Sequence, residues 1–276
     1  MLSPLVLGWR VWATLIYSLL PPDILFCLLM IFSPASAIVL SRIRYNDRYS
    51  IYHLYTLERG RVGVLVPEST HRRSPLRVHF QPLAELEVML EDNKRKDLLH
   101  IKEVRPIDLH HQVHLDPVKS AQAMFLSEFL YRVCTHPEAD PEVYHYISHS
   151  LELWGGLERG VANFHLCFLL HLLHVLGIAP QLPQEGEGRG LPFCLLDLVY
   201  TSTPRGASLS AEEALHLPAF LRMTYANMHC YRYSRVDRGV ILDHLLDYYR
   251  LHLHAFPALR SLPILRQLGQ EVLLRG

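Results

Sequence analysis

Apolar and polar side chains alternate along residues 37–105 with the period of two that is typical of β-strands. Turns that contain Gly, Pro or several charged residues separate the alternating runs. Strands are predicted over 37–44, 49–57, 61–66, 83–91 and 98–104. Five short, closely spaced strands predict a small barrel, for which a five-stranded OB-type barrel is the economical arrangement. The pattern alone leaves an SH3-like barrel open.

After residue 106 the apolar period becomes that of an α-helix. Asp116-Pro117 and Asp140-Pro141 each combine an N-cap residue with Pro at the first helical position. Ser210 and Glu213 have the spacing of a capping box. Helical signals cover 116–133, 140–156, 157–176, 240–253 and 262–274. The run 157–176 is apolar almost all round, as expected for a helix in the middle of a bundle.

The predicted fold class is therefore α+β. An N-terminal five-stranded OB-fold barrel occupies 37–106, and an all-α helical domain occupies 107–276. Residues 1–36 form an apolar leader whose two apolar runs are separated by Pro21-Pro22-Asp23. The leader fits a signal peptide ending at Ala35-Ser36-Ala37, a transmembrane helix broken by the two prolines, or a non-native extension upstream of a true start at Met30.

Charge is balanced over the whole chain, with 27 Lys and Arg against 27 Asp and Glu, which excludes a globally basic nucleic-acid binder. By region, the net charge is +4 over 37–105, −8 over 106–221 and +4 over 222–276. A small basic barrel suits single-stranded nucleic acid, because cations follow the phosphates and aromatic rings stack on bases. The candidate stacking residues are Tyr45, Tyr49, Tyr52 and Tyr55. An ordinary solvated surface over a Tyr-rich core is the alternative.

Motifs for catalysis or for metal binding are missing from the sequence. The 18 histidines include no HExxH, and the five cysteines include no CxxC pair. No GxSxG or P-loop occurs. No catalytic residue, metal site or cofactor is predicted, and the sequence argues against an enzyme. An esterase or metal hydrolase in the His-rich helices stays open as a minor alternative.

Several short motifs, weak one by one, share a specific order and spacing. They are Ile38-Val39-Leu40, Arg44-Tyr45, Gly60-Arg61, Phe80-Gln81-Pro82-Leu83, the run 101–106, the run 125–131 (FLSEFLY), the run 158–165 (ERGVANFH) and the run 248–253 (YYRLHL). Over 37–276 the chain resembles the RecO family of recombination mediator and DNA repair proteins, in the form found in Bacteroidetes-like bacteria.

The resemblance implies an OB-fold followed by a helical domain and no catalysis in the usual sense. It further implies binding of single- and double-stranded DNA, annealing of complementary strands, and help in loading recombinase onto DNA coated by single-strand-binding protein (SSB), as in the RecF pathway. The implied partners are RecR and the C-terminal tail of SSB, and the implied location is cytoplasmic, with no membrane. Family chains begin near Met30, so the third interpretation of the leader is favoured. A membrane-tethered adaptor and a non-catalytic interaction protein are the alternatives.

The chain departs from the family in three places. Asn46-Asp47-Arg48 replaces a short acidic motif, Glu68 dilutes the charge of the loop that ends in Arg72-Arg73, and the cysteines cannot form the four-cysteine zinc site of some members. Phosphate contacts are expected from basic side chains of the barrel, with Arg42, Arg44, Arg59 and Arg61 on one face. The full expected set is Arg42, Arg44, Arg48, Arg59, Arg61, Arg72, Arg73, Arg77, Lys94 and Lys96.

Overall fold

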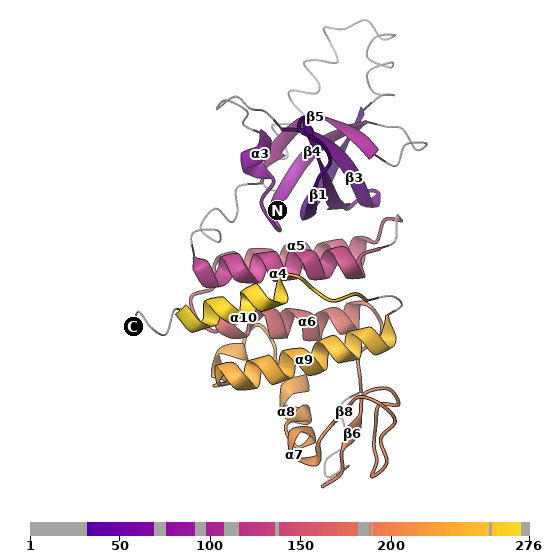
Figure 1. Ribbon diagram of the computed structural model, residues 1–276, viewed down its shortest axis with the longest axis vertical. Coiled ribbons are helices and arrows are strands. Elements are labelled where there is room, and N and C mark those ends of the chain that lie inside the picture. The colour runs from indigo at the N-terminus through magenta and orange to yellow at the C-terminus, as the bar shows by residue number, and fades with distance from the viewer. Residues whose placement is uncertain are drawn as a thin grey trace, which may run out of the picture.

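A computed structural model of the chain shows a barrel stacked on a helical body (Figure 1). The structure describes residues 32–68, 76–91, 98–107, 116–135, 138–181, 188, 190–253 and 256–271. The apolar runs of the leader before residue 32 lie outside the described residues. No helix in the part of the chain that the structure describes has the length and apolar character needed to cross a membrane.

The barrel is built from β1 (Phe32–Arg44), β2 (Tyr49–Thr56), β3 (Gly60–Pro67), β4 (Glu85–Glu91) and β5 (Leu98–Pro106). It closes in the order β1-β2-β3-β5-β4, and a short helix α3 (Leu76–His79) precedes β4. Only the β3–β5 pairing is parallel. The predicted five-stranded OB-fold barrel is confirmed.

Strand β1 begins at Phe32, five residues before the predicted strand and inside the segment assigned to the leader. Its first half pairs with β4 from Phe32↔Glu91 to Ile38↔Glu85. The small residues that resemble a cleavage site are structural, because Ala35 and Ala37 are buried in the barrel interior. The same small residues therefore serve as interior residues of a barrel strand.

The two faces of the barrel wall pack against different cores. One face fills the interior with residues such as Val39, Leu54 and Val64. The other face packs on the helical body through Ile38, Leu40, Tyr55 and Leu83, which belong to the helical core. The pairing of β1 with β2 shifts between Val39 and Ser41, which marks a β-bulge at Leu40.

The helical body contains α4 (Pro117–Val133), α5 (Pro141–Gly155), α6 (Phe164–Val175), α7 (Ala211–Ala214), α8 (Leu217–Leu221), α9 (Arg235–His252) and α10 (Leu262–Glu271), with the 3-10 turns η2 (Val161–Asn163) and η3 (Met228–Cys230). The predicted N-caps Asp116 and Asp140 and the capping box of Ser210 with Glu213 are confirmed. Helix α6 lies at the centre, and most of its side chains are buried on every side.

A three-stranded sheet of β6 (Phe193–Cys194), β7 (Val199–Tyr200) and β8 (Ser208–Leu209) lies at the far end of the helical body from the barrel (Figure 1). This sheet was not predicted, because strands of two residues are too short to show an alternating pattern. Helices α4 and α5 form the layer on which the barrel rests (Figure 1).

Candidate nucleic-acid interface

The β1–β2 turn presents two arginines and two tyrosines at one end of the barrel. Asn46 Oδ1 accepts the backbone N–H groups of Arg48 and Tyr49, each at 2.8 Å, and this closes the turn. Tyr45 is 61% exposed and Tyr49 is 38% exposed, while Arg44 and Arg48 are exposed beside them. We call Arg44, Tyr45, Arg48 and Tyr49 the rim. Cations next to exposed aromatic rings are the pair of features that single-stranded nucleic acid requires.

Arg44 is paired with Asp47 across the same turn at 2.8 Å, and both side chains are mostly exposed, at 73% and 95%. An ion pair so open to water contributes only about 0–1 kcal/mol. A phosphate can therefore replace Asp47 as the partner of Arg44 at little cost.

Arg42 is held more firmly, at the mouth of the barrel. Because of the bulge it lies opposite Tyr52, on the interior face, and its guanidinium lies 5.9 Å from the Tyr52 ring centroid. It donates to Ser50 Oγ at 3.2 Å and forms an ion pair with Glu68. The expected dilution of positive charge by Glu68 thus acts directly on Arg42.

Arg59 and Arg61 do not share a face with Arg42 and Arg44, so the expected arrangement of these four arginines on one face is wrong. Arg59 follows the end of β2 and donates to Ser33 Oγ. Arg61 lies on the outer face of β3, where it donates to the Tyr131 carbonyl at 3.1 Å and stands 5.2 Å from the Tyr131 ring. Strand alternation places Arg61 on the outer face, opposite Tyr55, while the bulge in β1 places Arg42 opposite Tyr52; Arg59 lies in the turn between β2 and β3.

Four of the expected phosphate contacts, Arg72, Arg73, Lys94 and Lys96, lie outside the described residues. The backbone of Arg77 belongs to α3. Two of the four candidate stacking rings are buried. Tyr52 packs on Phe80 with ring centroids 4.6 Å apart, and Tyr55 stacks on Tyr144 of α5.

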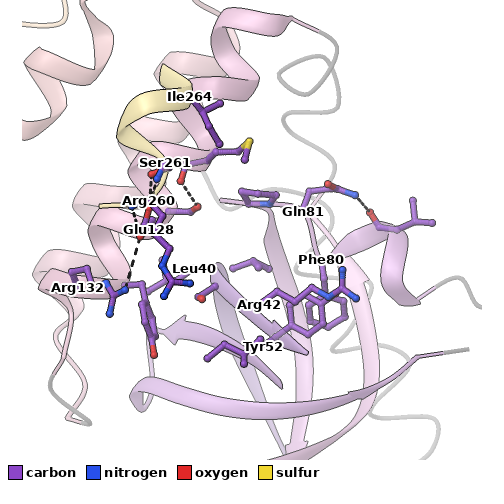
Figure 2. Close-up of a pocket in the computed structure, with 18 residues that line it drawn as sticks. Leu40, Arg42, Tyr52, Phe80, Gln81, Glu128, Arg132, Arg260, Ser261 and Ile264 are labelled. Atoms are coloured by element: carbon purple, nitrogen blue, oxygen red, sulfur yellow. Dashed lines mark hydrogen bonds and ion pairs between the residues drawn. The ribbon is translucent and has the colours of Figure 1, made fainter. Parts of the chain in front are cut away.

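A groove of about 1,020 Å³ separates the barrel from the helical body next to the rim (Figure 2). One wall is the segment Val39–Ile43 of β1 with Tyr52 and the residues around Phe80. The other wall comes from α4 and from the start of α10. Its residues are Met124, Ser127, Glu128, Tyr131, Arg132, Arg260, Ser261 and Ile264.

Glu128 fixes the start of α10 against α4. Its carboxylate accepts the backbone N–H groups of Arg260 and Ser261, at 3.0 and 2.7 Å, and the Ser261 hydroxyl at 2.6 Å. Burial alone would raise the pKa of Glu128, but the hydrogen bonds from Ser261 and Arg260 and the charge of Arg132 together hold that pKa below its usual value. The sequence analysis does not predict this contact, because it joins residues more than 130 positions apart in the chain.

Among the residues that the structure describes, no three His, Cys, Asp or Glu side chains are arranged to hold a metal ion. His171, in the apolar helix α6, lies 2.9 Å by its Nε2 from the Met223 carbonyl. The site therefore consists of cations, aromatic rings and an apolar groove.

Two family models match the chain. The model described as Recombination protein O N terminal matches residues 30–110, and the model described as Recombination protein O C terminal matches residues 114–263. Proteins named DNA repair protein RecO are similar over 84% of this chain. The one from Porphyromonas gingivalis is 40% identical, with 97% of its length covered. Those from Phocaeicola vulgatus and Bacteroides fragilis are 37% and 34% identical, each with 96% of its length covered.

Proposed function

The chain belongs to the RecO family of DNA repair proteins, and from this premise we propose that it binds single- and double-stranded DNA through the rim of its barrel. The observation that carries the proposal is the β1–β2 turn, where Arg44 and Arg48 stand beside the exposed rings of Tyr45 and Tyr49. Cations at this position neutralise phosphates, and the rings stack on unpaired bases. Arg72, Arg73, Arg77, Lys94 and Lys96 extend the proposed contact set, together with Arg42 when Glu68 releases it.

Annealing follows from the same surface in this proposal. Two complementary strands repel each other through their phosphates, and a cationic rim lowers that repulsion for both. Contacts to phosphates leave the base edges free to pair. The acidic stretch 106–221 lies mostly in the helical body and would keep DNA on the barrel side.

The partners are proposed on the strength of the family. RecR and the acidic, apolar C-terminal tail of SSB would bring the protein to SSB-coated strands in the cytoplasm, where it would help to load recombinase in the RecF pathway without catalysing a covalent step. Measuring recombinase assembly on SSB-coated strands, with and without this protein, tests that role.

A salt titration of single-strand binding tests the rim. In the double variant Arg44→Ala/Arg48→Ala, two phosphate contacts are lost, so affinity at 0.1 M salt falls about 25-fold and the slope of log K against log salt becomes shallower by about 1.4. The matched control is Arg222→Ala/Arg232→Ala, which removes two exposed arginines of the helical body. Equal affinities of the two double variants would remove the rim from the site.

The segment between Glu68 and Leu76 has its own test. Arg72→Glu/Arg73→Glu is expected to weaken DNA binding while the melting temperature stays that of the parent chain. Unchanged affinity at low salt would remove Arg72 and Arg73 from the contact set and leave the rim and the other proposed cations in it.

A further inference from the structure

The groove between the barrel and the helical body is a second cationic surface beside the rim. Its walls combine exposed apolar side chains with arginines from three separate segments of the chain (Figure 2). Ile43, Val78 and Met124 are 46%, 65% and 38% exposed. Arg42 lies on the barrel wall, while Arg132 and Arg260 lie on the helical wall.

The two arginines of the helical wall retain much of their capacity to bind an anion. The Nη2 of Arg132 is 3.9 Å from Glu128, which is too far for a hydrogen bond. The Glu128 oxygens are instead taken up by the N–H groups and hydroxyl at the start of α10. Arg132 lies 5.3 Å from the Tyr131 ring, and its Nε is buried without a hydrogen-bond partner. The Arg260 side chain is exposed, and within the described residues no ion pair involves it.

The groove continues the surface of the rim. Its barrel wall is Val39–Ile43, and the next residue along β1 is Arg44, the first residue of the rim. A chain that contacts Arg44 and Tyr45 can therefore pass into the groove without leaving the protein surface.

We propose that this groove binds a segment of single-stranded DNA that runs on from the rim, with Arg132 and Arg260 on its phosphates and the apolar wall residues against its bases. The proposal rests on the proposed function and adds a second subsite to it. A duplex hides its bases and would leave Ile43, Val78 and Met124 without apolar contacts. An acidic peptide fits the arginines, but only a strand held at the rim makes use of the continuity between the two surfaces.

The first test changes Arg260. Its backbone N–H donates to Glu128 whatever its side chain is, so the latch, as we call the hydrogen bonds from Arg260 and Ser261 to Glu128, survives the substitution. In the full chain, Arg260→Ala is expected to weaken binding of a 20-nucleotide single strand about fivefold at 0.1 M salt and to reduce the salt slope by about 0.7, as for one lost phosphate contact. Arg222→Ala, at the end of α8, is the control. Duplex affinity is expected to change less than single-strand affinity.

The second test measures directly whether single-stranded DNA occupies the groove. In a Cys27→Ser/Cys230→Ser background, Met124→Cys places a thiol on the helical wall, and Leu215→Cys places one at the end of α7, far from the barrel (Figure 1). Saturating single strand is expected to slow maleimide labelling several-fold in Met124→Cys and to leave Leu215→Cys unchanged. Circular dichroism of each variant confirms the fold.

The outcomes separate the two proposals. Weaker binding in Arg260→Ala together with protection of Met124→Cys supports the groove. Unchanged affinity in Arg260→Ala and an unprotected thiol, while Arg44→Ala/Arg48→Ala still weakens binding, overturn the groove and keep the rim. If Arg260→Ala loses binding to an acidic apolar peptide while its DNA affinity is unchanged, the groove is a peptide site and the groove proposal is overturned. Failure of the parent chain to bind single strands overturns both.

Discussion

The Glu68 carboxylate sets how much positive charge the mouth of the barrel offers to DNA. It pairs with Arg42 and accepts a hydrogen bond from Ser50, and its side chain is only 17% exposed. A carboxylate this close to Arg42 competes with any phosphate for the same guanidinium. Removal of the negative charge of Glu68 should therefore strengthen DNA binding without unfolding the barrel.

Glu68→Gln is expected to tighten single-strand binding about threefold at low salt, and the gain should fade as salt screens the charges. The amide can still accept the Ser50 hydroxyl, so the melting temperature should change little. Glu152→Gln, on the exposed side of α5, makes the same change of net charge and should leave affinity as it was. Equal effects of the two substitutions would show that only net charge matters.

His165 is a buried base that has to stay neutral. Trp154 Nε1 donates to Gln122 Oε1 at 3.0 Å, so the Gln122 amide nitrogen faces His165 Nδ1 at 3.3 Å as a donor. His165 Nδ1 must then accept and cannot carry a proton. Burial, and to a lesser degree the charge of Arg238, lower the pKa of His165 to about 3.

The stability of the fold should fall on acidification because of this residue. In the unfolded chain His165 takes up a proton near pH 6.5, whereas in the native chain it does so only near pH 3. Between these values the free energy of unfolding therefore falls by about 1.4 kcal/mol for each pH unit of acidification. Chemical denaturation at pH 7.5 and pH 5 is expected to differ by about 2 kcal/mol from His165 alone. His165→Gln should be less stable at pH 7.5 and lose that part of the pH dependence. A pH dependence of stability in His165→Gln equal to that of the parent chain would contradict a neutral His165 in the native state.

At the residue scale the sequence predicts which charges and rings are present better than it predicts which face of a strand each side chain occupies. The effect of Glu68 on the barrel charge follows from its position in the loop. The burial of Tyr52 and Tyr55 and the separation of Arg61 from Arg42 depend on which face each residue occupies. The bulge at Leu40, the ninth of the 13 residues of β1, reverses the faces, and alternation alone does not reveal where a strand takes in an extra residue.

Elements are predictable where local chemistry starts or stops them. Asp116-Pro117 and Asp140-Pro141 begin α4 and α5 as expected, and Gly177 follows α6 in the left-handed conformation, with φ 70°. The start of β1 at Phe32 was missed, because its Ser, Pro and Ala residues pair with a strand about 55 residues later in the chain. Long-range pairing of this kind leaves no local pattern.

The contact between α4 and α10 is expected to depend on the charge of Glu128. Glu128→Gln keeps the shape but removes the charge that three donors share, which should cost about 1–2 kcal/mol of unfolding free energy. Hydrogen exchange should then accelerate in α10 more than in α6. Glu152→Gln is again the matched control. Unchanged protection of α10 would contradict a latch at this position.

The whole molecule is more tightly joined than a division into barrel and helical domain suggests. Ile38, Leu40, Tyr55 and Leu83 come from the barrel, yet their contacts belong to the core of the helical body. Tyr131 of α4 reinforces the junction from the other side, with the His53 ring 4.8 Å away and the Arg61 guanidinium 5.2 Å away. The groove therefore lies at a junction held by a shared apolar core, which should keep its two walls at a fixed separation.

A shared core makes one cooperative unit, and Leu40→Ala tests this. Leu40 is 2% exposed and stands on the barrel wall inside the helical core, so the truncation should cost about 2–5 kcal/mol. Because the barrel cannot lose this face without exposing the helices beneath it, calorimetry should show one transition, shifted as a whole, and amide protection should fall together in β2 and α6. Val236→Ala, on the exposed side of α9, should shift nothing. Two transitions, of which Leu40→Ala moves only one, would mean that the barrel melts independently and that the groove has no fixed width.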